Sequence, residues 1–355
     1  MSQTDSRPPQ LNDTEFEQAC QFVMQLVSQA HRYGVSFVRL GTFIAQLSSN
    51  FGFRGQMLAT PPFLLLEFWR PTDTQPRRFI HRLPEESFDL SKLSQLGSLV
   101  NKVVAGKVPF DKGTAGLKQI DSLQNPYGNL AVALGYSLCG AGFAVLLSAT
   151  WRDVFFAAVL SLVVFAITLY AGRSQWLAKR INFTAALAAS LLANVIALLF
   201  PGSDPFTVTL CAVVVLVPGL ALTLGIAELA SKSVISGMER LIDGVLITFA
   251  LVVGSAIGSS VVSALWTIPA PAAAPDHSLG VTFFFILLLM LGLAFIFQVR
   301  RRDLGWAIIA GGLAYAGVLI GGQFGDWQGS FLGALVLGIY ASLFTFRLHL
   351  SLIHI

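Results

Sequence analysis

The chain has 355 residues, of which 54% are hydrophobic and only 12% are charged. Because ordinary soluble domains carry about 25% charged residues, this composition excludes a protein that is water-soluble along its whole length. The formal net charge of +4 is modest and is not gathered into a basic run, so we expect no nucleic-acid partner.

Charge is distributed unevenly along the chain. Residues 1–128 contain 13 Lys and Arg and 11 Asp and Glu, whereas residues 129–355 contain 10 and 8. This difference predicts a soluble domain followed by a membrane part. Residues 1–12 are polar, so we expect a disordered segment there, and they lack the apolar core of a signal peptide.

Residues 13–128 predict a small α+β domain. A helical pattern runs from Thr14 to Gly52, with a break expected at Gly34. The elements expected after it are strands at "PPFLLLEFW" (61–69) and "RRFIHRL" (77–83), a helix that follows an N-cap at Asp89 and ends at Gly106, and a helix over 109–123.

The sequence predicts neither a catalytic nor a metal site. His31 and His81 have no Cys, Ser or acidic partner at a telling spacing, and the chain has no Walker motif. Cys20, Cys139 and Cys211 are scattered without metal or redox spacing, so we expect buried thiols. We therefore expect a protein that is not an enzyme and needs no cofactor.

The rest of the chain predicts a mostly α, polytopic membrane protein. A bilayer core about 30 Å thick requires about 20 apolar residues of helix. About eight transmembrane helices are expected, five in a module over 129–266 and three in a partial C-terminal module over 279–355. The stretches are Asn129–Ser148, Val154–Gly172, Thr184–Phe200, Phe206–Ala230, Leu241–Trp266, Leu279–Gln298, Leu304–Gly322 and Gly329–Leu348.

The basic residues in the loops predict the orientation of these spans. Cytoplasmic loops carry an excess of Lys and Arg. If the N-terminal domain is cytoplasmic, the opposite loops hold Arg152 alone. The loops on the cytoplasmic side then hold the other nine basic residues, namely Arg173, Lys179, Arg180, Lys232, Arg240, Arg300, Arg301, Arg302 and Arg347. The sequence thus predicts a multi-pass protein with a cytoplasmic N-terminus.

The fourth span contains a Pro-Gly pair, Pro218–Gly219, close to its middle. Transporters place broken helices near the bilayer midplane, where a half-helix N-terminus offers free N–H groups and partial positive charge to an anionic group. Thr223, four residues on, could add a hydroxyl, and that geometry suits a substrate carboxylate. The alternative is a kink that serves helix packing alone.

Polar residues at membrane depth are the other candidates, because they are costly there. Asn194, halfway along the third span, is either a substrate ligand or an interhelical hydrogen-bonding group. Glu228 and Asp243 are candidates to carry a coupling proton. The alternatives are an interfacial carboxylate near Lys232 for Glu228, and a surface pair with Arg240 for Asp243.

Several segments resemble the threonine/serine exporter family. They are "VPGLALTLGIAELASKSVISGMERLIDGVLI", "HRYGVSFVRL", "GQMLATPPFLLLEF", "FDLSKLSQLGSLVNKVVAGKV" and "FQVRRRDLGWAIIAGGLAYAGVLIGG". The resemblance covers nearly the whole chain. It implies export of threonine, serine or similar small amino acids across the bacterial inner membrane, driven by the proton gradient.

The chain departs from the family in one respect. Family members carry a further pair of spans with a second Pro-Gly signature, whereas this chain ends after its eighth span at "RLHLSLIHI". We therefore expect a C-terminally shortened protein or a fragment, in which a second copy or a partner chain would supply the missing helices. An exporter or channel for dicarboxylates or another small organic anion is the alternative function, followed by a membrane sensor or enzyme.

Overall fold

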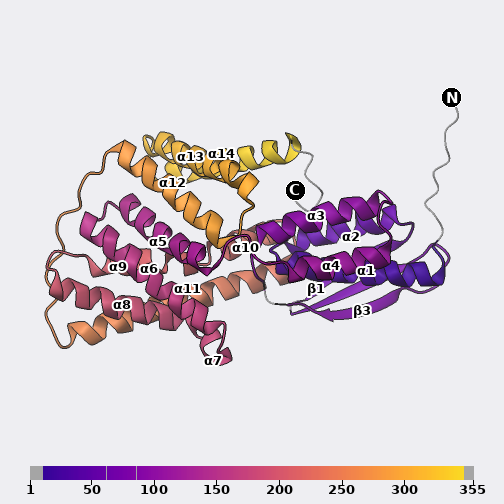
Figure 1. Cartoon of the computed structure of the whole chain (residues 1–355), viewed down its shortest axis with the longest axis horizontal. Coiled ribbons are helices and arrows are strands. Elements are labelled where there is room, and N and C mark those ends of the chain that lie inside the picture. Colours follow the sequence, from indigo (N-terminus) through magenta and orange to yellow (C-terminus); the bar gives the residue numbers. More distant parts are fainter. Residues whose placement is uncertain (1–10, 61, 85, 348–355) are drawn as a thin grey trace. The chain divides into compact units, whose positions relative to one another are not determined.

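The computed structural model describes residues 11–60, 62–84 and 86–347 (Figure 1). It divides into two compact units. The first, called the α+β unit, comprises the described residues of Met1–Asn125, Leu220–Ile242 and Ser342–Ile355. The second, called the helical unit, comprises Pro126–Gly219 and Asp243–Ala341. The predicted disordered segment falls outside the described residues up to position 10.

Four helices of the α+β unit come from the first 125 residues. They are α1 (Asp13–Arg32), α2 (Phe37–Asn50), α3 (Leu90–Val104) and α4 (Phe110–Ser122). Asn12 and Glu15 form a capping box at the start of α1. The chain turns after α1 at Gly34, whose φ of +98° is a left-handed conformation that favours glycine. Asp89 caps α3 through the Lys92 N–H, as predicted.

A three-stranded antiparallel sheet completes the part of this unit that lies within residues 11–60, 62–84 and 86–125. The strands are β1 (Arg54–Thr60), β2 (Phe63–Trp69) and β3 (Arg77–Arg82), in the order β1-β2-β3. Leu65 on β2 lies opposite Leu58 on one side and Ile80 on the other. The pairing of β2 with β3 confirms the prediction, whereas β1 was not predicted because "RGQMLAT" shows no clean alternation of apolar and polar residues.

The core of this unit lies between the sheet and the helices, which cover one face of it (Figure 1). Leu64, Leu66 and Phe68 point inward from β2 with no exposed surface. They join fully buried residues of the first two helices, among them Phe22, Leu26, Leu40 and Ile44. Burial of each such side chain contributes about 1.5–3 kcal/mol.

Two further helical segments belong to the same unit. They are α10 (Gly219–Ala230) and the first residues of α11 (Val234–Ser263). The two segments pack closely because each presents a glycine to the other. A Cβ on Gly237 would lie 2.9 Å from the carbonyl oxygen of Gly225, so a larger residue would force the two helices apart.

The helical unit is built from long apolar helices and short connecting ones. They are α5 (Asn129–Leu146), α6 (Trp151–Ala171), α7 (Gln175–Ala178), α8 (Ile181–Leu199), α9 (Pro205–Val213), η1 (Val214–Leu216), the rest of α11, α12 (Leu279–Ile296), η2 (Arg301–Asp303), α13 (Leu304–Gly322) and the residues of α14 (Asp326–Arg347) up to Ala341. Glycines allow close packing here as well: a Cβ on Gly135 of α5 would lie 2.8 Å from the Gly292 carbonyl oxygen of α12.

Six helices of the described chain are long and apolar enough to cross a membrane, or seven if the broken pair α9–η1 and α10 counts as one span. Their large apolar side chains are widely exposed, such as Phe155, Phe249 and Phe284, which suits contact with lipid tails. The predicted number of eight is not confirmed. The last predicted span contains only a shorter apolar helix, Trp327–Leu343, and its final residue, Leu348, lies outside the described residues.

Candidate functional site

The predicted break in the fourth span is present in the backbone. Helix α9 ends at Val213, a single 3-10 turn follows, and Val217 is extended with φ −65° and ψ 125° before α10 begins at Gly219. Pro218 has no N–H to continue the helical ladder, and the Val217 N–H bonds back to the Val214 carbonyl at 3.1 Å. The first turn of α10 therefore has the backbone N–H groups of a helix N-terminus.

The surroundings of the break differ from residue to residue. Pro218 is buried, whereas Gly219 and Thr223 are exposed. A Cβ placed on Gly219 would meet no atom of the described chain within 4 Å. Gly219 therefore has room for a side chain, and a substitution there tests the site rather than the packing.

Asn194 lies 2% exposed on α8. Its Nδ2 donates to the Ser190 carbonyl at 2.8 Å, and its Oδ1 accepts from the Ser259 hydroxyl on α11 at 3.4 Å. The Ser190 hydroxyl in turn donates to the Ser255 carbonyl at 2.7 Å. Asn194 thus makes the interhelical hydrogen bond that was the alternative interpretation, and its role as a substrate ligand stays a prediction.

Glu228, near the end of α10, lies in a buried ionic cluster together with His31, Glu86 and Arg240. Its side chain is 1% exposed, and Oε1 accepts a hydrogen bond from the Phe37 N–H at 3.0 Å. Phe37 is the first residue of α2, and the Ser36 side chain makes no capping bond there. A carboxylate nearly 200 positions later in the sequence thus caps α2 and interacts with its positive end.

Arg240, 5% exposed on α11, is the cation of this cluster. Its Nη1 donates to Glu86 Oε2 at 3.0 Å, and its Nε lies 3.4 Å from Glu228 Oε1. The guanidinium also lies over the Phe37 ring, 5.5 Å from the centroid. Arg240 therefore joins α11, α10 and the residues after β3 within the α+β unit.

His31 closes the cluster on the side of α1. Its ring stacks on Phe37 with centroids 4.8 Å apart, and its Nδ1 lies 3.6 Å from Glu86 Oε1, beyond hydrogen-bond distance. Glu86 is already paired with Arg240, so it lends His31 little negative charge. Burial, followed by repulsion from Arg240, lowers the pKa of His31 from 6.5 to about 4. His31 is accordingly neutral at physiological pH.

The cluster changes the interpretation of both predicted acids. Arg240 pairs with Glu86 and Glu228 rather than with Asp243, so the proposed surface pair of Asp243 is wrong. Asp243 itself is exposed on α11. Glu228 is a buried partner of Arg240, and its position at the membrane interface stays a prediction. Its second oxygen, Oε2, accepts no hydrogen bond within the described residues.

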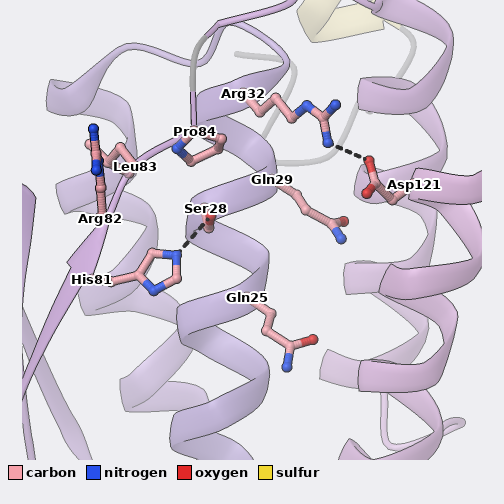
Figure 2. A pocket seen from close by; sticks show the side chains of 9 residues that line it. All are labelled: Gln25, Ser28, Gln29, Arg32, His81, Arg82, Leu83, Pro84 and Asp121. Carbon is pink, nitrogen blue, oxygen red and sulfur yellow. Dashed lines mark hydrogen bonds and ion pairs between the residues drawn. The ribbon is translucent and has the colours of Figure 1, made fainter. Parts of the chain in front are cut away.

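A second polar site, a pocket of about 520 Å³, opens elsewhere on the α+β unit (Figure 2). It lies among α1, α4 and the end of β3. Its nine lining residues are Gln25, Ser28, Gln29, Arg32, His81, Arg82, Leu83, Pro84 and Asp121. Sequence reasoning missed both the pocket and the role of Arg240, because neither set of residues is close in the sequence.

The three cysteines are free and buried, as predicted. Burial raises the pKa of the Cys20 thiol to about 12, so this thiol stays protonated and unreactive in the folded protein. Within the described residues, the His, Cys, Asp and Glu side chains form no group of three that could hold a metal ion.

Long apolar helices, one of them broken at a Pro-Gly pair, together with a polar α+β unit, define a helical transmembrane protein of the transporter class. The comparison with family models narrows this class. The model described as "Putative threonine/serine exporter" matches residues 21–262, and the chain belongs to this family. The match begins within α1, includes the helices from α5 to α10 with the broken span, and ends at Val262 in α11.

Curated relatives are similar at low identity. A "Probable threonine/serine exporter" of Mycobacterium tuberculosis is 28% identical over 185 residues, which are 52% of this chain and 34% of the relative. A "Threonine/serine exporter" of Corynebacterium glutamicum is 25% identical over 211 residues, 57% of this chain and 43% of the relative. The "Pheromone-regulated membrane protein 10" of Debaryomyces hansenii is 21% identical over 343 residues, 91% of this chain and 33% of the relative.

The chain thus spans well under half the length of these relatives. No solved structure matches it. The relatives include yeast as well as bacterial proteins.

Proposed function

We propose that the chain exports small hydroxy amino acids, such as threonine and serine, across a membrane. Family membership supports this proposal, and so does the name of the relative from Corynebacterium glutamicum, a threonine/serine exporter. The observation that carries it is the interruption of an apolar segment at Pro218–Gly219, because a broken span gives a transporter polar backbone groups inside the bilayer.

The substrate carboxylate would bind at the first turn of α10. The positive end of the helix dipole favours an anion there, and the exposed Thr223 lies one turn further along the same helix. Pro218 would interrupt the helical hydrogen bonding before this turn, and Gly219, which has no side chain, would leave space beside it. Asn194 would serve as a polar group of the α8–α11 pair.

Coupling to protons would use Glu228 or Asp243. Glu228 is the stronger candidate because its Oε2 is buried without a hydrogen-bond donor among the described residues, and a proton on that oxygen would leave Arg240 paired with Glu86 alone. Protonation would thereby weaken the contacts that hold α10 and α11 to α2. A transport cycle can use such a charge-dependent contact as a switch.

The location proposed for the protein is the bacterial inner membrane, with the N-terminus in the cytoplasm, on the basis of the nine-to-one distribution of basic residues described above. The partners would be the substrate, protons and the bilayer.

The test is release of amino acids from bacterial cells that are loaded with threonyl or seryl dipeptides. We expect cells that express the chain to release threonine and serine faster than cells with an empty vector. Release of succinate is measured in the same cells. Faster release of succinate without faster release of threonine or serine would contradict the proposal and favour the organic-anion alternative.

A further inference from the structure

We propose that the pocket of the α+β unit binds a small zwitterion of the amino-acid type, a free amino acid or a dipeptide, as a regulatory ligand. Its residues all belong to that unit, and none of them is among the residues proposed for transport. The pocket volume of about 520 Å³ is within the range typical of small-molecule sites. The proposal rests on the proposed function only for the choice of threonine and serine as probes.

One wall of the pocket is a polar stripe on α1. Ser28 and Gln29 each lie three or four residues from both Gln25 and Arg32, which places the four residues on one face of the helix. This face is unusual for α1, whose other faces supply nine buried residues to the core and the ionic cluster. Figure 2 shows the Gln25 and Gln29 side chains extending on the side of α4, where Asp121 lies.

The end of β3 supplies positive charge for a carboxylate. Arg82 is exposed at the pocket and forms no ion pair within the described residues. Next to it, His81 Nε2 lies 3.1 Å from the Ser28 hydroxyl, so the ring is held toward α1 (Figure 2). Arg82 at the rim of the pocket, and the His81–Ser28 pair within it, are groups that can bind a carboxylate.

The other end of the pocket supplies acceptors for an ammonium group. Gln29 Nε2 donates to the Leu117 carbonyl at 3.0 Å, which fixes the amide, while Gln29 Oε1 is buried without a donor among the described residues. Asp121 adds a carboxylate, which also accepts from Arg32 at 2.9 Å. Arg32 and Asp121 balance each other's charge, so Arg82 at the rim and the buried Gln29 Oε1 acceptor remain, and together they favour a zwitterion over a plain anion.

The pocket is linked directly to the buried ionic cluster. Arg32 and Pro84 line the pocket, while their near neighbours His31 and Glu86 belong to the cluster. The end of α1 and the segment after β3 are connected by a hydrogen bond from the Ser87 N–H to the Arg32 carbonyl at 2.6 Å. A ligand that orders these residues would therefore also stabilise the contacts of Glu86 with Arg240 at the start of α11.

The test is hydrogen exchange, measured by mass spectrometry, on the full-length chain in detergent or nanodiscs. Threonine, serine, a threonyl dipeptide, succinate and phosphate are added in turn. We expect threonine, serine or the dipeptide to protect peptides from α1, from β3 and from α4 against exchange. Arg82→Gln should raise the half-saturating concentration of the ligand about tenfold or more, and Arg82→Lys should restore part of the lost affinity. Arg54 is another exposed arginine of the unit, and Arg54→Gln should leave the half-saturating concentration unchanged.

Three results would overturn the proposal: no protection of these peptides by any amino acid or dipeptide, equal protection by succinate or phosphate, or protection that persists unchanged in Arg82→Gln. The outcome is separable from that of the proposed function. Loss of threonine release with intact protection contradicts export alone, whereas intact release without protection contradicts the regulatory site alone.

Discussion

Replacement of Arg240 by methionine should destabilise the α+β unit strongly. Methionine approximates the length of the arginine stem without its charge, so the change leaves two carboxylates, Glu228 and Glu86, beside each other without a cation. Glu228 is 1% exposed and cannot regain its hydration by a small movement. Removal of one partner of a buried ion pair costs about 3–5 kcal/mol, because the remaining charge stays buried.

The structure places the expected loss within that range. Glu86 is 22% exposed and can turn toward water, which favours the lower end, whereas Glu228 also loses the charge that balances it at the α2 cap. We therefore expect a loss of about 3 kcal/mol for Arg240→Met. Glu228→Gln should cost less, about 1–2 kcal/mol, since the amide oxygen can still accept from the Phe37 N–H and Arg240 keeps Glu86.

The buried cysteines provide the assay. Cys20 lies in the core of the α+β unit with no exposed surface, so a thiol-reactive fluorogenic dye reacts with it only after that unit unfolds. Replacement of Cys139 and Cys211 by alanine leaves Cys20 as the single reporter. Unfolding is then followed against temperature or denaturant in the wild-type background, in each single variant and in the Glu228→Gln/Arg240→Met double variant.

The double variant distinguishes a specific interaction between Glu228 and Arg240 from independent destabilisation by each substitution. If Glu228 and Arg240 interact as the structure shows, the cost of the double change should be smaller than the sum of the two single costs by about 0.5–3 kcal/mol. Purely additive costs, or a stability of Arg240→Met within about 0.5 kcal/mol of the wild type, would refute the reasoning.

Four further predictions concern the break, the interhelical bond, the exposed acid and the buried imidazole. Gly219→Leu should abolish threonine release while the protein still inserts and folds, whereas Gly280→Leu, at a glycine that also has open space, should leave release unchanged; normal release by Gly219→Leu would mean that the break is a packing kink. Asn194→Ala should lower the stability of the helical unit by about 1 kcal/mol, measured by thermal unfolding, and no change would show that the α8–α11 bond contributes nothing. Asp243→Asn should flatten the pH dependence of transport if this acid carries the proton, and an unchanged profile would leave Glu228 as the candidate. The pKa of His31 is about 4 in the folded protein and 6.5 in the unfolded chain, so its contribution to stability is present above pH 6.5. As the pH falls from 6.5 to 4, the free energy of unfolding should decrease by about 3 kcal/mol. His31→Gln should remove this dependence of stability on pH, and an identical dependence in both proteins would contradict the burial of a neutral ring.

The sequence was sufficient for the helices that depend on local signals. The α3 cap at Asp89, the break at Gly34 and the helices of the helical unit follow from residue type and apolar length within short windows. The β1 strand depends on pairing with β2, which no local pattern of "RGQMLAT" reveals. The last predicted span is not confirmed, because its apolar part in the described chain, Trp327–Leu343, is shorter than the other candidate spans, although α14 itself runs from Asp326 to Arg347.

The candidate site shows the same division between local and distant information. The Pro-Gly break can be seen in the sequence because proline removes its own N–H. The partners of Glu228 could not be found in this way, because Phe37 and Glu86 are distant in the sequence and meet Glu228 and Arg240 only through folding. The signal that the sequence did offer was a Glu and an Arg on two neighbouring helical segments, which pack closely at Gly225 and Gly237.

The most direct measurement is release of labelled threonine from liposomes that contain the purified chain, with and without an imposed proton gradient. We expect a proton gradient to accelerate the release of threonine, and succinate inside the vesicles not to be released in its place. Gly219→Leu should abolish the release of threonine, whereas Gly280→Leu should preserve it. Equal release from protein-free liposomes, or from liposomes with Gly219→Leu, would contradict export through the interrupted helix.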